Sequence, residues 1–237
     1  MGKDKKRFAS LSPGIINLKP LKQIRMDTLD ILRTLKFLPG ILLGLTIHEF
    51  SHAFVATKCG DTTSKDQGRV TLNPLKHIDP FGFMMLLVAG FGWAKPVRFN
   101  EKNLNNPRTD IMKIAVAGPF SNALTAIILT LIFAVIYKIY PGNYNSITSE
   151  IFIYSIYINW GLFIFNLIPI PPLDGSHLLL NYFRRYPKLY MILYKYGSFI
   201  LLGLILGSVF TRINLFPIWP VIEFFGKGFL VLLGVPV

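Results

Sequence analysis

Two histidines and a glutamate lie close together in a long, mostly apolar stretch of the chain. His48-Glu49-Phe50-Ser51-His52 is an HExxH motif, and it stands inside residues 37–57. On a helix, positions i and i+4 lie about one turn apart, so both imidazoles project from one face and can bind a single Zn²⁺. The glutamate beside the first histidine can then act as general base towards a water molecule. The motif therefore predicts a hydrolytic zinc site with His48 and His52 as ligands.

The apolar surroundings give this motif more weight than it has in a soluble sequence, where HExxH can arise by chance. Inside a membrane, each ionisable group costs on the order of 2–3 kcal/mol or more, so it needs partners and a function. Three such groups within five residues are difficult to explain as structural residues alone. We therefore interpret the motif as functional.

A catalytic zinc also needs a third protein ligand, and Asp174 is the candidate. It is the only acidic residue near the end of another apolar segment, and prolines 169, 171 and 172 precede it. These prolines end the preceding helix and favour extended backbone, which at membrane depth must line protein or a cavity. That setting favours an aspartate that turns towards the metal. The alternative is that Asp174 only caps a helix beginning at Gly175.

The composition indicates that membrane helices position these residues. Apolar residues make up 52% of the 237 residues and charged residues 16%, against about 25% in ordinary soluble domains. These proportions argue against a soluble globule and exclude a disordered chain, and the single Cys59 excludes an internal disulfide. The net charge of +13 fits cytoplasmic loops and anionic lipids better than nucleic acid.

The expected fold is an all-α polytopic membrane protein of about five to six transmembrane helices. A span needs about 20 apolar residues, and the segments that qualify are 37–57, 111–137, 150–170, 189–210 and, less clearly, 215–236. Residues 80–94 are apolar but short and rich in glycine, which favours a re-entrant or short β-hairpin insertion after the first span. Residues 68–73 and 96–100 are either short strands of this insertion or ordinary loops.

The chain divides into two parts by charge and hydropathy. Residues 1–36 are polar and basic, and we expect them to form an amphipathic helix on the membrane surface. Residues 37–237 form the membrane-embedded domain that carries the HExxH motif. No internal repeat and no linker to a soluble domain is visible in this part.

The basic residues predict a topology for a multi-pass protein of the cell membrane. Lys and Arg gather in residues 58–110 and 171–188, whereas residues 138–149 contain only Lys138. The positive-inside rule places the first two loops in the cytoplasm and the site near the cytoplasmic face. The first span must then enter from outside, although nine Lys and Arg before residue 37 favour a cytoplasmic N-terminus. The side of the N-terminus therefore stays open.

Several motifs in order resemble a known family. They are HEFSH at 48–52, NPLKHIDPFG at 73–82, GWAKPV at 92–97, AGPFSN at 117–122 and a pattern from Asn166 to Pro172-Leu173-Asp174-Gly175. From about residue 40 to 185 the chain resembles the site-2 protease family of intramembrane zinc metalloproteases, in its compact bacterial and archaeal branch. The resemblance implies that His48, His52 and Asp174 bind zinc, that Glu49 is the base and that Asn122 contacts the substrate or its oxyanion. Asn122 is otherwise only the amide that follows a Gly118-Pro119 helix kink.

The function expected from motif and resemblance is intramembrane proteolysis. One Zn²⁺ per chain would activate water to cleave transmembrane segments of membrane-anchored proteins, with the lipid bilayer as surroundings and no nucleic acid partner. A membrane zinc-binding transporter and a non-catalytic membrane chaperone of the same fold are the alternatives, and Glu49 argues against both because neither needs a base. His77 is interpreted as structural, and His177 as a surface histidine or a rival ligand. Nothing in the sequence indicates the oligomeric state.

Overall fold

The computed structural model describes residues 31–89, 92–140, 147–178, 186–211 and 218–235, and it is mostly helical in these ranges, with no strand in them. The long helices are α2 (Ile31–Lys58), α5 (Pro107–Ile139), α6 (Ile147–Asn166), α8 (Pro187–Thr211) and α9 (Trp219–Leu232). The shorter ones are α3 (Thr63–Asp66), α4 (Pro80–Ala89), η1 (Pro74–Lys76) and η2 (Glu101–Asn103). The expected all-α membrane protein is confirmed.

Four of the described helices are long and apolar enough to cross a membrane. They contain Leu35–Lys58, Pro107–Ile139, Ile147–Asn166 and Met191–Ser208. The helix in the fifth expected span, 215–236, is shorter than a membrane span. α9 has only 14 residues, so it is about 21 Å long, whereas a bilayer core is roughly 30 Å thick. Pro220 lies in its first turn and Gly234, with φ of +78°, follows its end. The number of spans among the described residues is therefore smaller than expected.

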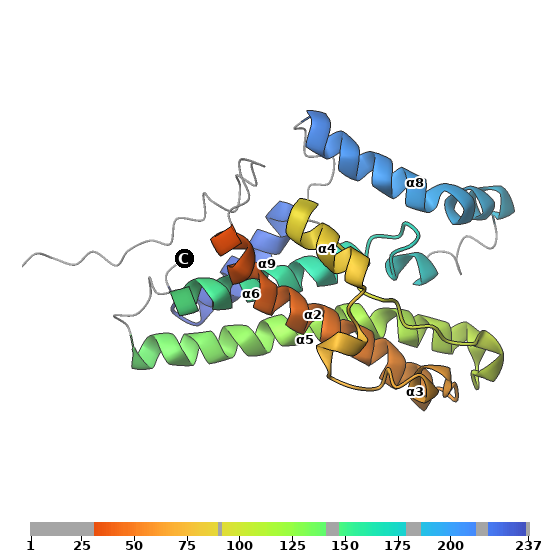
Figure 1. Ribbon diagram of the computed structural model, residues 1–237, viewed down its shortest axis with the longest axis horizontal. Coiled ribbons are helices and arrows are strands. Elements are labelled where there is room, and N and C mark those ends of the chain that lie inside the picture. The colour runs from red at the N-terminus through yellow and green to blue at the C-terminus, as the bar shows by residue number, and fades with distance from the viewer. Residues whose placement is uncertain (1–30, 90–91, 141–146, 179–185, 212–217, 236–237) are drawn as a thin grey trace, which may run out of the picture.

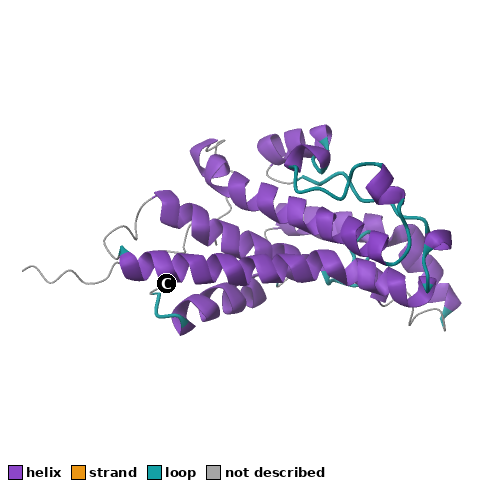
Figure 2. Cartoon of the chain, turned by 90° about the horizontal axis from the view of Figure 1, so that it is seen from below, coloured by secondary structure: helices purple, strands orange, loops and turns teal. Residues whose placement is uncertain are grey.

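Helices α2, α5 and α6 pack side by side and form the centre of the molecule (Figure 1). α2 and α6 run in the same direction, and α5 runs in the opposite one. The C-terminal ends of α2 and α6 and the start of α5 therefore share one end of the bundle, where most of the loops gather (Figure 2). The apolar core lies between α5, α6 and α9, with Phe133, Ile156 and Leu230 each at most 2% exposed.

The close contact between α2 and α6 depends on glycine. A Cβ on Gly40 would lie 2.6 Å from the Ser155 Cα, and a Cβ on Gly44 would lie 2.7 Å from the Leu162 Cδ1. Small residues of this kind let helix backbones approach closely in membranes, where packing rather than the hydrophobic effect holds helices together. The two glycines therefore set α2 against α6 just before the HExxH motif begins.

The insertion after the first span consists of loops and short helices. Its one described β-contact is an isolated bridge between Ile78 and Ala94, and residues 68–73 and 96–100 are irregular. The strand interpretation of these two segments is therefore wrong, and the loop interpretation is confirmed. A buried side chain joins these loops in place of the hydrogen bonds between strands. The Arg69 guanidinium donates to the carbonyls of Lys76 and Lys95. With ten residues, α4 is too short to cross the membrane.

The surface helix expected in residues 1–36 falls mainly outside the described residues. Only its last six residues are described, and they belong to the first turns of α2.

Candidate metal centre

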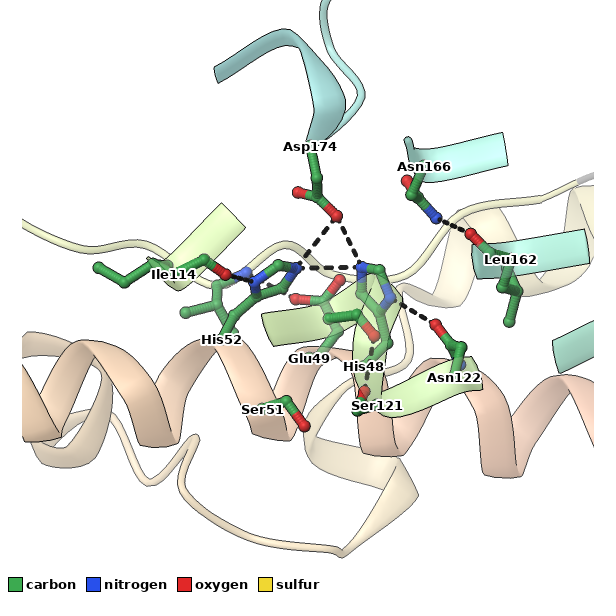
Figure 3. A network of polar contacts seen from close by, with 12 residues as sticks. His48, Glu49, Ser51, His52, Ile114, Ser121, Asn122, Leu162, Asn166 and Asp174 are labelled. Carbon is green, nitrogen blue, oxygen red and sulfur yellow. Dashed lines mark hydrogen bonds and ion pairs between the residues drawn. The ribbon is translucent and has the colours of Figure 1, made fainter. Parts of the chain in front are cut away.

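Three side chains that the sequence marks as ligands meet in the structure. His48 and His52 project from the same face of α2, and their Nε2 atoms are 3.0 Å apart. The Asp174 Oδ2 lies 3.1 Å from the His48 Nε2 and 3.3 Å from the His52 Nε2 (Figure 3). Among the described residues, these three form the one group of His, Cys, Asp or Glu side chains close enough to share a metal ion.

The second nitrogen of each imidazole has its own partner on α5. The His48 Nδ1 lies 2.7 Å from the Asn122 Oδ1, and the His52 Nδ1 lies 2.7 Å from the carbonyl oxygen of Ile114. Both oxygens are acceptors, so each Nδ1 carries the proton and donates it. The amide orientation of Asn122 is fixed by its Nδ2, which donates to the Gly44 carbonyl at 3.0 Å. With its proton on Nδ1, each imidazole can present the Nε2 lone pair to a metal.

This protonation pattern leaves three lone pairs facing one another. Two bare Nε2 atoms and the Asp174 Oδ2, which has no hydrogen-bond donor among the described residues, lie within 3.3 Å of each other. Such an arrangement is repulsive unless a cation, either a proton or a metal ion, lies between the atoms. Two imidazoles and one carboxylate, with partners on the outer nitrogens, are a donor set that suits catalytic zinc. The residues therefore fit the metal that the sequence predicts.

Gly118 on α5 makes room for the two imidazoles. A Cβ at this position would lie 2.4 Å from the His52 Nε2 and 2.7 Å from the His48 Nε2. The helix continues through the neighbouring Pro119 from Pro107 to Ile139. The Gly118-Pro119 pair therefore does more than bend a helix, because the missing side chain lets α5 approach the donor atoms.

Asp174 reaches the histidines from an irregular segment that follows α6. The chain leaves α6 at Asn166, and a new helical turn begins directly after Asp174, at Gly175. A Cβ on Gly175 would lie 2.3 Å from the Leu167 carbonyl oxygen, so only glycine lets the segment fold back against the end of α6. Asp174 thus stands at the start of a helix, as the capping alternative required, while its Oδ2 points to the imidazoles.

Glu49 is buried beside the three donors but is held by different groups. Its side chain leaves α2 next to His48 (Figure 3), and the residue is 8% exposed. The Val97 N–H donates to its Oε2 at 2.9 Å, and the Arg69 Nη2 lies 3.9 Å from the same oxygen. Arg69 is itself 4% exposed. The loop after the first span therefore orients this carboxylate.

Asn122 lies at the site with all its polar hydrogens engaged. It is fully buried, and its Nδ2 donates to the Gly44 carbonyl and, at 3.1 Å, to the Asn159 Oδ1. The Asn159 Nδ2 in turn donates to the Ser155 carbonyl at 2.8 Å. This chain of bonds orients His48. The contact with substrate or oxyanion that the resemblance implies stays a prediction, because it requires one of these bonds to break.

The two other described histidines lie apart from the donor cluster. His77 is 1% exposed, and its Nε2 donates to the Thr71 carbonyl at 2.8 Å. Burial lowers the pKa of His77, so its ring is uncharged at neutral pH. His177 is exposed. Neither belongs to the group formed by His48, His52 and Asp174.

The comparison with known families agrees with this geometry. Peptidase family M50 matches the chain over residues 36–141 and 135–204, which include all three donors and Glu49. The chain belongs to peptidase family M50, the site-2 protease family. The resemblance seen in the sequence motifs is confirmed.

Curated relatives of this M50 member are named as zinc metalloproteases. "Putative zinc metalloprotease YwhC" of Bacillus subtilis is 43% identical over 59% of this chain and 65% of its own length. "Putative zinc metalloprotease Rip2" of Mycolicibacterium smegmatis is 30% identical over 57% of this chain and 52% of its own length. "Putative zinc metalloprotease MJ0611" of Methanocaldococcus jannaschii is 34% identical over 57% of this chain and 64% of its own length.

The chain spans between about half and two thirds of the length of these relatives. No solved structure matches it.

Sequence reasoning missed three parts of the M50 site. Asn159 is a polar residue in the middle of an apolar span, and that setting was a usable signal. Arg69 looked like one of many loop cations, and nothing in its neighbours indicated that it is buried. The space that Gly118 leaves for the imidazoles depends on how α5 packs on α2, which no local pattern reveals.

Proposed function

We propose that this protein is an intramembrane zinc metalloprotease that cleaves transmembrane segments of membrane-anchored proteins, as in regulated intramembrane proteolysis. The observation that carries the proposal is the geometry of the donor cluster. Each Nδ1 faces an acceptor on α5, and two Nε2 atoms and one carboxylate oxygen face a common point. Glu49 lies beside them with its own partners. Family membership and the names of the relatives support the same chemistry.

One zinc ion per chain would be held by His48, His52 and Asp174. When bound, zinc supplies Lewis acidity, which lowers the pKa of water and polarises a peptide carbonyl. Asn122 and the Ile114 carbonyl keep both imidazoles in the tautomer that a metal requires. The protein's part in binding is therefore to hold three donors with their lone pairs free.

Glu49 would act as the general base and then as the general acid. Its carboxylate accepts the proton of the attacking water and later returns it to the amine of the leaving peptide. The Val97 N–H fixes one carboxylate oxygen, and the Arg69 Nη2 lies 3.9 Å from the same oxygen. The second oxygen is left for the proton.

A zinc-binding transporter is the alternative from another class. Intramembrane His and Asp groups serve ion pathways as well as catalysis. A transport site has no use for a buried carboxylate that stands among the ligands and is oriented by a separate loop. The position of Glu49 therefore favours hydrolysis.

Glu49→Gln tests this function directly. The substitution keeps the size of the side chain and removes its ability to take a proton. A general base contributes on the order of 10²–10⁴-fold in rate, so cleavage of an apolar single-span peptide in detergent should almost disappear. The zinc content, measured by elemental analysis of the same preparation, should stay near one per chain.

The matched control is Glu101→Gln, which removes a carboxylate from the first turn of η2, outside the metal centre. This variant should cleave at the wild-type rate. Cleavage by Glu49→Gln at the wild-type rate would contradict the proposed mechanism. Loss of zinc in Glu49→Gln would instead make Glu49 a ligand.

We further propose that the site opens near the cytoplasmic face. The loop at the site's end of the bundle carries a row of cations: Lys58, Lys65, Arg69, Lys76, Lys95, Arg98, Lys102 and Arg108. At the opposite end, Lys138 closes α5, and Arg33 and Lys36 stand at the start of α2, where Lys36 pairs with Glu150. The larger number of cations therefore lies at the site's end. Basic loops of this kind remain in the cytoplasm.

Thiol labelling tests this orientation. The buried Ser176, at 2% exposed, is unsuitable as a reporter, whereas His177 is exposed. His177→Cys in a Cys59→Ser background should react with a membrane-impermeant thiol reagent in inverted vesicles and not in intact cells. Tyr140→Cys, at the other end of the bundle and 61% exposed, should show the reverse. The opposite pair of results would place the site near the outer face.

A further inference from the structure

A cavity of about 170 Å³ lies beside α2, one helical turn before Glu49. Its walls come from α2, α4, α6 and the segments around residues 77–78 and 92–94. We call it the α2–α4 cavity. Its α2 wall consists of Ile41, Leu42, Leu45 and Thr46. Glu49 follows Leu42, Leu45 and Thr46 on the same helical face, about one further turn of 5.4 Å along α2. The cavity therefore adjoins the proposed base.

Glycine contacts hold the wall opposite α2 in place. A Cβ on Gly82 would lie 2.3 Å from the Trp93 carbonyl oxygen, and a Cβ on Gly92 would lie 2.2 Å from the Gly82 carbonyl oxygen. The start of α4 and the segment after residue 91 thus touch backbone to backbone. Trp93, which is 45% exposed, brings this wall to the surface. The cavity is therefore formed by close packing and can be reached from outside.

The chemistry of the walls selects an apolar occupant. None of the residues that line the cavity carries a charge, since burial keeps His77 neutral. An ionised side chain placed here would lose its water without gaining a partner. An apolar cavity of roughly 150 Å³ is large enough to bind benzene. At about 170 Å³, this one has room for a phenyl ring or a branched aliphatic group.

We propose that the α2–α4 cavity is a specificity pocket that takes one apolar side chain, of leucine or phenylalanine size, from the substrate polypeptide. The inference rests on the proposed protease function. Because the cavity begins one turn from Glu49, the residue that enters it stands next to the bond that is cleaved. A site-adjacent pocket of this size discriminates side chains by steric fit, and one missing methylene in such a pocket changes rates about 10–200-fold.

Two neighbouring leucines on α4 provide a matched test. Leu86 lines the cavity, whereas Leu87 does not and is 38% exposed. Leu86→Trp should fill the pocket, and Leu86→Ala should enlarge it. Leu87→Trp and Leu87→Ala are the matched controls, because they make the same changes at the neighbouring position outside the cavity. All four are compared with the wild type as full-length, zinc-loaded protein in detergent.

The substrate is a library of apolar single-span peptides with randomised positions, and mass spectrometry identifies each cleaved bond. The wild type should prefer Leu, Phe or Met over Gly and Ala at one position flanking that bond, by at least about tenfold. Leu86→Trp should shift this position towards Gly, Ala and Ser. Leu86→Ala should admit Trp there. Both Leu87 variants should keep the wild-type profile.

The outcomes separate this proposal from the proposed function. If the wild type cleaves but the Leu86 variants keep its profile, the pocket proposal is overturned and the protease function stands. If the zinc-loaded wild type cleaves no peptide, the protease function fails and the pocket with it. If the Leu86 variants cleave all peptides more slowly, and the size of this loss depends on the acyl-chain length of added lipid, the occupant of the cavity is a lipid and the pocket proposal is overturned. Should Leu86→Trp not fold, the profile of Leu86→Ala decides alone.

Discussion

The two sides of the proposed zinc site are built in different ways. On the histidine side, His48 and His52 stand on one long helix, are 6% and 8% exposed, and each gives its Nδ1 proton to an acceptor on α5. On the aspartate side, Asp174 stands on an irregular segment, its side chain is 20% exposed, and Oδ2 has no donor among the described residues. Two donors are thus oriented by the packing of α5 on α2, whereas the third has no such partner among the described residues.

Both sides nevertheless depend on a glycine at a close contact. Gly118 leaves space for the imidazoles, and Gly175 lets the segment of Asp174 fold against the end of α6. The contact at Gly118 is between a helix and side chains, and the one at Gly175 is between two backbones. Backbone atoms cannot move aside as side chains can, so we expect a substitution on the aspartate side to have the larger effect.

The largest effect is expected from removing the aspartate side. Asp174→Ala leaves two histidines as ligands, and two ligands do not hold catalytic zinc. Zinc affinity should fall by more than the 10–100-fold typical of losing an outer partner, and peptide cleavage should fall with it. Zinc retained after dialysis, measured by elemental analysis, reports the change.

His77→Ala and His177→Ala are the controls for this experiment, and both should keep their zinc because neither side chain belongs to the cluster. Full zinc retention in Asp174→Ala would remove this residue from the ligand set.

A smaller effect is expected from loosening the histidine side. Asn122→Leu removes the acceptor of the His48 Nδ1 proton, so zinc affinity should fall about 10–100-fold. The equivalent partner of His52 is the Ile114 carbonyl, which no side-chain change removes. Competition with a chelator measures the affinity. Asn166→Leu is the control, since the Asn166 Nδ2 donates to the Leu162 carbonyl and not to either histidine.

This experiment also separates two roles of Asn122. A positioning residue changes zinc affinity, whereas an oxyanion donor changes the cleavage rate at saturating zinc and leaves the affinity unaltered. The second result would support the substrate contact that the resemblance implies.

The smallest effect is expected beyond the end of α2, where Asp61 anchors the loop that carries Arg69 and Val97. Its buried carboxylate accepts from the Thr63 hydroxyl, the Asn100 N–H and the Asn103 amide. Burial alone would raise the pKa of Asp61, but these bonds outweigh it and the pKa is lowered. The resulting stability is present above the unfolded pKa and is lost as the pH falls through the folded pKa.

Asp61→Asn should therefore lower the midpoint of thermal unfolding in detergent by a few °C at neutral pH, and the difference from wild type should shrink in acid. Asp66→Asn is the control, because Asp66 accepts only from the exposed Thr62 hydroxyl. An equal difference at every pH would show that the charge of Asp61 contributes nothing.

Part of the fold could be read from the sequence because it rests on local patterns. Runs of about 20 apolar residues predict spans wherever they occur, and each of the four candidate spans among the described residues overlaps an expected segment. The misread elements were short. Residues 68–73 and 96–100 alternate like strands, but a strand needs a partner, and Arg69 bonds the carbonyls of this region instead.

The same distinction applies to the site. The i, i+4 spacing of His48 and His52 places both imidazoles on one helical face whatever the rest of the chain does. Asp174 could be singled out because few acidic residues border an apolar segment. By contrast, the partners of the histidines lie 62 and 74 residues away in the chain, so no local pattern could pair them.

The sequence by itself therefore determined the long helices and the candidates for the ligands and the base, since these follow from hydropathy, helical periodicity and the chemistry of each side chain. Tertiary structure decided which atoms meet. Only the packing of α5 on α2 assigns the imidazole protons to Nδ1, and only the fold of the loop after α2 brings Val97 and Arg69 to Glu49. The α2–α4 cavity has the same origin, because its walls come from segments between residues 41 and 162 that touch only in the folded chain.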